Sequence, residues 1–83
     1  PGPDKKELLV EYTMKADCNN IDYHEGVNIG RFCGGIASAK KLGHIDEETF
    51  KAVKSALESR KSKLESECYA KAVSNLMEFE SAP

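Results

Sequence analysis

Apolar residues recur every three or four positions along most of the chain, which is the spacing of α-helices rather than strands. The first such segment follows Asp4, which precedes Glu7 by three residues, as in a capping box. A helix is therefore predicted over residues 5–17. A second helix is predicted over 22–42, and a third pattern runs over 46–80. The chain predicts an all-α fold: a short helix, a glycine-faced helix and a long C-terminal helix.

The corner between the second and third helices carries the clearest local signals. Gly43 suits a helix C-terminus, Asp46 suits the start of the next helix, and Ile45 and Phe50 have the spacing of a hydrophobic staple. The stretch 42–50 resembles a corner that recurs in short helical hairpins of bacterial and phage proteins. This resemblance implies a helical hairpin but no particular activity. The size and style of the chain lead us to expect a bacterial or phage accessory protein.

The third helix is too long for a domain of this size. Without glycine or proline between Asp46 and Pro83, it would span about 52 Å at 1.5 Å per residue. A compact chain of 83 residues is only about 30 Å across. Either the helix breaks in the polar stretch 58–63, or its far half packs against another subunit. We favour the second solution and expect a homodimer, with an interface that includes Leu64, Cys68, Tyr69, Val73, Leu76 and Met77.

Glycines spaced by four residues form a small-residue strip on the second helix, comprising Gly26, Gly30, Gly34 and Ala37. Such a strip lets another backbone approach closely. It is expected to receive another helix of the same chain, with a second copy or a protein partner as the alternative occupant. A phosphate-binding loop is disfavoured, because the spacing matches neither known glycine-rich fingerprint and no strand precedes it.

The charge balance argues weakly against nucleic acid. The net charge is −2, whereas DNA-binding domains usually concentrate cations on one face. A small DNA-binding transcriptional regulator is the alternative function, using the corner around Gly43 and the basic stretch from Lys51 to Lys63. In that reading the helix entering the groove would begin with the carboxylates of residues 46–48, which phosphate would repel.

Three cysteines, Cys18, Cys33 and Cys68, are an odd and widely spaced set. They indicate reduced thiols in a cytoplasmic protein rather than a disulfide framework, with an intermolecular bridge through Cys18 left open. No pair has zinc-ligand spacing, so no metal site or cofactor is predicted. Although Cys18 and His24 lie near one corner, nothing visible orients the imidazole, and no enzyme activity is expected.

We therefore expect one helical domain over 1–83, with 1–3 as a disordered or expression-derived leader and 81–83 as a frayed tail. No apolar run is long enough to cross a membrane. The predicted function is a non-catalytic, self-associating module that binds a protein partner or regulates it. His24, Asn28 and Arg31 share a polar side of the second helix and form a candidate contact stripe.

Overall fold

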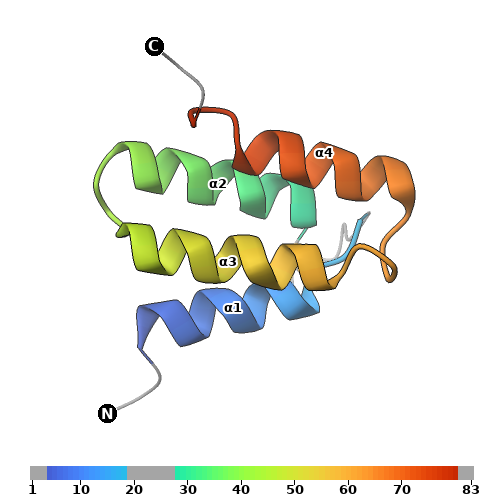
Figure 1. Cartoon of the computed structure of the whole chain (residues 1–83), viewed down its shortest axis with the longest axis horizontal. Helices are drawn as coiled ribbons and strands as arrows, with labels where there is room; N and C mark the ends of the chain where they lie inside the picture. Colours follow the sequence, from blue (N-terminus) through green and yellow to red (C-terminus); the bar gives the residue numbers. More distant parts are fainter. Residues whose placement is uncertain (1–3, 19–27, 81–83) are drawn as a thin grey trace.

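The computed structural model describes residues 4–18 and 28–80, and this part of the chain folds into four α-helices (Figure 1). Their bounds are α1 (Lys5–Lys15), α2 (Ile29–Lys41), α3 (Glu47–Ser59) and α4 (Ser66–Leu76). The all-α prediction is confirmed for the described residues. The predicted three-helix arrangement is wrong, because the expected C-terminal helix is divided into α3 and α4.

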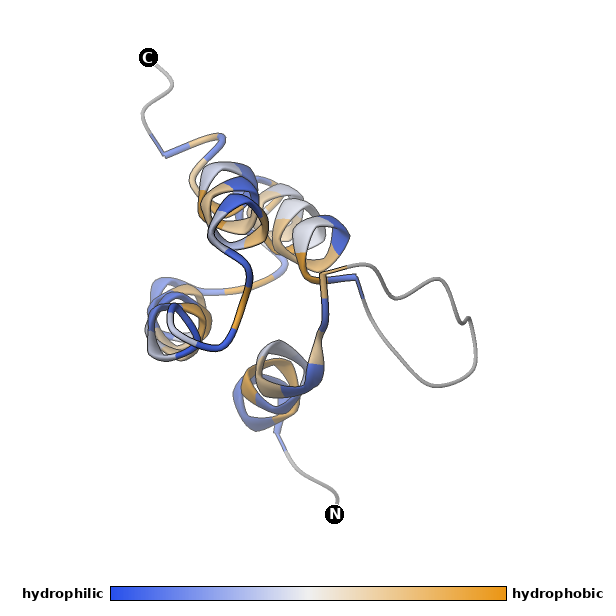
Figure 2. Cartoon of the chain, turned by 90° about the vertical axis from the view of Figure 1, so that its right-hand side faces the viewer, coloured by the Kyte–Doolittle hydropathy of each residue, from blue (hydrophilic) through white to orange (hydrophobic). Residues whose placement is uncertain are grey.

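The helices pack as two pairs, α1 with α3 and α2 with α4, and the corner between α2 and α3 joins the pairs. Seen end-on, their apolar sides turn toward the space between them (Figure 2). Buried residues from α2, α3 and α4, together with residues beside the helices, fill this space: Ala16, Ile29, Cys33, Ile36, Ile45, Phe50, Val53, Leu57, Ala72 and Leu76. Helices α2, α3 and α4 thus each bury one side in a shared core, and Leu9 of α1 packs partly buried against it.

Local capping sets the helix starts near the predicted positions. The Asp4 carboxylate accepts a hydrogen bond of 2.8 Å from the Glu7 backbone N–H. At the start of α3, the Asp46 carboxylate accepts a bond of the same length from the Thr49 backbone N–H. Gly43 adopts a positive φ of 79° at the corner, a conformation that glycine takes without a Cβ clash. The predicted corner and the starts of α1 and α3 are confirmed.

Two helix bounds differ from the sequence prediction. The first helix ends at Lys15, because Ala16 turns to an extended conformation and is fully buried. The second begins at Ile29: Asn28 is extended and caps the helix, with its side-chain oxygen accepting from the Arg31 backbone N–H at 3.1 Å. A helix running unbroken from Asp22 to Leu42 is therefore wrong at Asn28, and the predicted start at Asp22 lies outside the described residues.

The predicted long helix ends at Ser59, in the polar stretch that was the alternative solution. Tight turns follow, in which the Lys63 backbone N–H donates to the Arg60 carbonyl at 2.9 Å. The turns retain backbone hydrogen bonds, so the break forfeits little helix energy. Folding back then buries Ala72 and Leu76 against the core, and each large apolar side chain gains about 1.5–3 kcal/mol on burial. A straight helix would have left these side chains in water.

Candidate interaction surfaces

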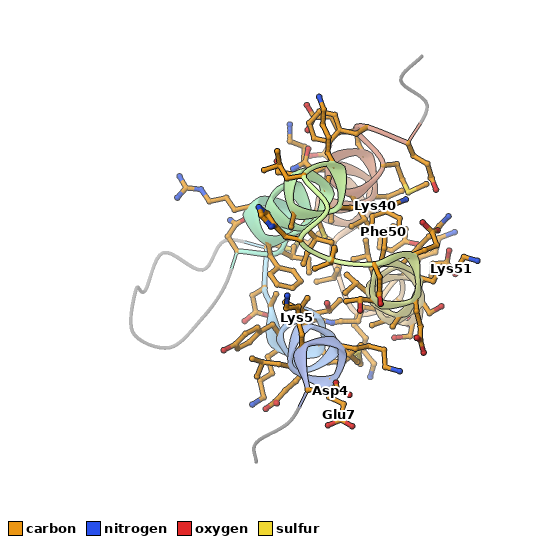
Figure 3. All side chains as sticks on the ribbon, turned by 90° about the vertical axis from the view of Figure 1, so that its left-hand side faces the viewer. Asp4, Lys5, Glu7, Lys40, Phe50 and Lys51 are labelled. Carbon is orange, nitrogen blue, oxygen red and sulfur yellow. A yellow bond between two sulfur atoms is a disulfide. The ribbon has the colours of Figure 1, made fainter. Side chains whose placement is uncertain are left out.

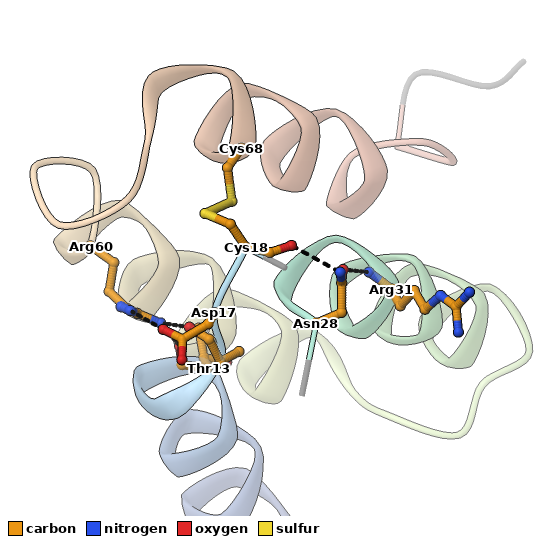
Figure 4. Close-up of a disulfide and its surroundings, with 8 residues drawn as sticks. Thr13, Asp17, Cys18, Asn28, Arg31, Arg60 and Cys68 are labelled. Atoms are coloured by element: carbon orange, nitrogen blue, oxygen red, sulfur yellow. Dashed lines mark hydrogen bonds and ion pairs between the residues drawn. A yellow bond between two sulfur atoms is a disulfide. The ribbon is translucent and has the colours of Figure 1, made fainter. Parts of the chain in front are cut away.

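A disulfide between Cys18 and Cys68 ties the segment after α1 to the first turn of α4 (Figure 4). The two Cα atoms lie 5.7 Å apart, within the usual range for a disulfide. The prediction of reduced thiols is wrong for this pair, because the fold-back of α4 brings together residues separated by 50 positions. The remaining cysteine, Cys33, is free and buried, and burial raises the pKa of its thiol to about 11.

Arg60 reaches from the turn after α3 to the end of α1, where its guanidinium donates to the carbonyls of Thr13, at 3.0 Å, and Ala16 (Figure 4). It also lies 3.9 Å from the carboxylate of Asp17. Its side chain is only 11% exposed. Helix carbonyls at a C-terminus lack intrahelical partners and carry partial negative charge, so this cation satisfies them. Arg60 is therefore a structural residue that closes α1.

Asn28 performs a similar role on the other side of the disulfide. Its side-chain nitrogen donates to the carbonyl of Cys18 at 2.9 Å, and the Ile29 backbone N–H donates to the carbonyl of Asp17 at 2.8 Å. The backbone bond belongs to the isolated bridge between Asp17 and Asn28. The chain leaving α1 and the chain entering α2 are thus joined beside the disulfide.

The predicted polar stripe is only partly a free surface. Asn28 is engaged as the α2 cap and in the bond to Cys18, whereas Arg31 is exposed and extends away from the junction (Figure 4). His24 lies outside the described residues. A cavity of about 480 Å³ adjoins this region, lined by Cys18, Asn28, Gly30, Arg31, Glu65, Glu67, Cys68, Lys71 and Asn75. Its charged lining has both signs, so it favours neither an anion nor a cation.

The glycine strip receives α4 of the same chain at one position. A Cβ on Gly30 would lie 3.5 Å from the side-chain nitrogen of Asn75, and that nitrogen donates to the Gly30 carbonyl at 3.0 Å. Ala37 is buried within the chain. Gly34 differs, since nothing lies within 4 Å of its Cβ position. Packing of a helix of the same chain on the strip therefore accounts for Gly30 but not for Gly34. Gly26 lies outside the described residues.

The residues of α4 and its flanks that were predicted for a dimer interface pack on the chain's own core. Leu76 is buried, and the others are partly buried against the core cluster: Leu64, Cys68, Tyr69, Val73 and Met77. The surplus apolar surface that favoured a dimer through this segment is thereby largely accounted for within one subunit.

Helix α1 keeps more apolar surface in the open than its position in the fold explains. It carries five large apolar side chains, Leu8, Leu9, Val10, Tyr12 and Met14, yet its buried residue is Thr13. Tyr12 and Met14 are 40% and 48% exposed. The Tyr12 ring meets Phe32 of α2 edge-on, with 6.4 Å between ring centroids. The helical spacing predicted a helix here but did not identify these side chains as a surface.

The basic stretch of the DNA-binding alternative is not one continuous surface. Lys51 is exposed on α3, whereas Arg60 turns inward to the carbonyls of α1. At the start of α3, Glu47 pairs with Lys40 and Glu48 pairs with Lys6, each at 3.1 Å. These ion pairs offset the negative charge of carboxylates that would face phosphate, but they do not create a positively charged surface.

The described residues contain no group of three or more His, Cys, Asp or Glu side chains placed to hold a metal ion. Within the same ranges, no helix has the length and apolar character needed to cross a membrane. Comparison with protein-family models, with curated proteins and with solved structures gave no match to the chain. What the chain does must therefore be inferred from its own surfaces.

Proposed function

We propose that the chain is a non-catalytic module that binds a protein through α1 and the adjoining edge of α2. The observation that carries the proposal is the exposure of Tyr12, at 40% and beside Phe32 of α2, on a helix that is apolar around much of its circumference. Aromatic residues such as tyrosine are enriched at protein interfaces relative to other surface. An exposed tyrosine fixed by a neighbouring ring is a better candidate for contact than scattered single apolar residues.

The geometry around Tyr12 suits a contact that forms at low entropic cost. Leu8 lies four residues earlier, on the same side of α1, and is half-buried. Phe32 supports the Tyr12 ring from α2. The edge-on ring pair already restricts the Tyr12 side chain. Covering Tyr12 therefore costs less side-chain entropy than ordering a mobile side chain would. We name Leu8, Tyr12 and Phe32 the α1–α2 patch.

A second copy of the chain is the first partner to consider. Domains of this size bury a smaller fraction of their surface on folding than larger domains do, and they often gain stability by association. With the apolar side chains of α4 packed within the subunit, the α1–α2 patch is the surface through which we propose self-association. A different protein bound at the same patch would retain the proposed function without the homodimer.

The cellular setting follows from the disulfide. The cysteine count favoured the cytoplasm, where thiols are kept reduced, but a disulfide between Cys18 and Cys68 persists in an oxidising compartment. We therefore propose that the module works in an oxidising setting.

The experiment places a photo-crosslinking benzophenone amino acid at position 12, with position 51 on exposed α3 surface as the matched control. Irradiation of the purified protein, followed by mass analysis, should give an adduct of twice the subunit mass from position 12 alone. Light scattering after gel filtration should show the same mass. If the purified protein is monomeric, irradiation in the native source should yield one discrete adduct from position 12.

Equal labelling at positions 12 and 51, or no discrete adduct at position 12 in either setting, would overturn the proposal. A retardation assay on random duplex DNA at low salt tests the DNA-binding alternative, because non-specific binding is dominated by phosphate contacts. A shift that disappears with rising salt would favour that alternative over a protein partner.

A further inference from the structure

A second cavity, of about 300 Å³, lies where the ends of α2 and α4 meet the start of α3. Buried side chains contribute its apolar part: Ala37 of α2, Phe50 of α3 and Leu76 of α4. Phe79, just beyond α4, also lines it. Ligand sites are typically concave, mostly apolar and about 300–1,000 Å³ in volume. This cavity meets that description at the small end of the range.

Two lysines from the last turn of α2 line the same cavity. The ammonium of Lys40 lies 4.0 Å from the centroid of the Phe50 ring. Figure 3 labels both side chains, which lie next to each other in that view. The ammonium of Lys41 lies 4.4 Å from the centroid of the Phe79 ring. Cation–π contacts of this kind hold a flexible lysine over a ring face. Both positive charges are thereby fixed beside an apolar cavity.

The two lysines differ in their acidic neighbours. Lys40 is paired with Glu47 at 3.1 Å, so part of its charge is already balanced. The close contact of Lys41 is the Phe79 ring, and an ammonium ion over a ring keeps its capacity to donate hydrogen bonds to an anion. Glu80 also lines the cavity, which disfavours a ligand with more than one negative charge.

We propose that this cavity binds a small monoanion with an apolar body, such as a medium-chain or aromatic carboxylate, with the anionic group contacting Lys41. The apolar body lies in the cavity among Ala37, Leu76 and Phe79, and burial of the ligand's own apolar surface supplies most of the affinity. The lysine provides orientation and preference for an anion. This site lies on α2, α3 and α4 and is independent of the α1–α2 patch, so either proposal can fail without the other.

The test compares octanoate with two probes of the same chain length, octanol and octylammonium, by titration of ¹⁵N-labelled full-length protein. Octanoate should shift the amide signals of Ala37, Lys41, Leu76 and Phe79 and leave those of α1 in place. Octanol should bind more weakly and octylammonium weaker still. Equal affinity for the three probes, or shifts spread along the whole chain, would overturn the proposal.

The matched variants are Lys41→Gln in the cavity and Lys61→Gln in the exposed turn after α3. Loss of one charge-assisted hydrogen bond should weaken octanoate binding by about tenfold in Lys41→Gln and leave octanol binding unchanged. Lys61→Gln should bind octanoate as the wild type does. Both lysines are exposed, so both variants should fold, which far-UV circular dichroism will verify. An unchanged octanoate affinity in Lys41→Gln would refute the assigned contact.

Discussion

Reduction of the disulfide between Cys18 and Cys68 should remove a large part of the chain's stability. The two residues are separated by 50 positions, and closing a loop of that length restricts the unfolded chain by about 4 kcal/mol in the chain-entropy treatment. Domains have roughly 0.05–0.15 kcal/mol of stability per residue, which for 83 residues is about 4–12 kcal/mol. The disulfide should therefore contribute about a third or more of the free energy of unfolding.

The assay is urea unfolding followed by circular dichroism, with and without a phosphine reductant. With an unfolding slope of about 1 kcal/mol per M urea, the midpoint should fall by about 3–4 M on reduction. The variant carrying both Cys18→Ser and Cys68→Ser is the control, because its midpoint should resemble that of the reduced protein and not respond to reductant.

Thiol counting checks the pairing itself. In the native oxidised protein at pH 8, iodoacetamide should not modify Cys33, because its buried thiol has a pKa of about 11 and stays protonated. Denaturant alone should expose one reactive thiol, and denaturant with reductant should expose three. Three reactive thiols without reductant, or a midpoint that reduction leaves unchanged, would refute the reasoning.

The remaining predictions concern α2, the Arg60 junction and the start of α3. Gly34→Ala should raise the free energy of unfolding, measured with urea, by about 0.5–1 kcal/mol, because nothing lies near the added Cβ. Gly30→Ala should show no such gain, because its Cβ would lie 3.3 Å from the Asn28 side-chain oxygen. Arg60→Ala should lower the free energy of unfolding by about 2 kcal/mol, because the carbonyls at the end of α1 lose their hydrogen-bond donor. An equal loss in the surface control Lys61→Ala would contradict this role of Arg60. Backbone and side-chain hydrogen bonds from Thr49 lower the pKa of Asp46, so its stabilisation is present above the unfolded pKa and lost as pH falls through the folded pKa. The thermal midpoint of Asp46→Ala should lie below that of wild type at pH 7 and converge with it in acid; a pH-independent gap would count against the cap.

The starts of α1 and α3 and the tight corner between α2 and α3 were predictable because their causes are local. A carboxylate three residues before an amide caps a helix whatever the rest of the chain does, and Asp4 and Asp46 both do so. Gly43 ends α2 through its own backbone freedom. The buried positions of α3, such as Phe50 and Val53, follow from helical periodicity. These parts of the fold need only neighbours within about one turn.

The second half of the chain depended on distant contacts. No glycine or proline marks the end of α3 at Ser59, and the chain turns there because α4 gains burial against α2 and because Arg60 meets the α1 carbonyls. Sequence periodicity alone allowed the straight helix equally well. Periodicity reports which side of a helix is apolar but not which element covers it.

The same reason limited the candidate surfaces. The α4 side chains were predicted for a subunit interface, and the fold-back packs them against the core of the same chain. The pairing of Cys18 with Cys68 also followed only from that fold-back. Conversely, helical spacing does not show that Tyr12 stays at the surface: α1 packs chiefly on α3, which leaves the Tyr12 ring partly exposed beside Phe32. The sequence by itself determined where α1 and α3 begin and which sides of the helices are apolar. The tertiary structure decided which apolar sides stay exposed, because burial depends on segments that lie far apart in the chain.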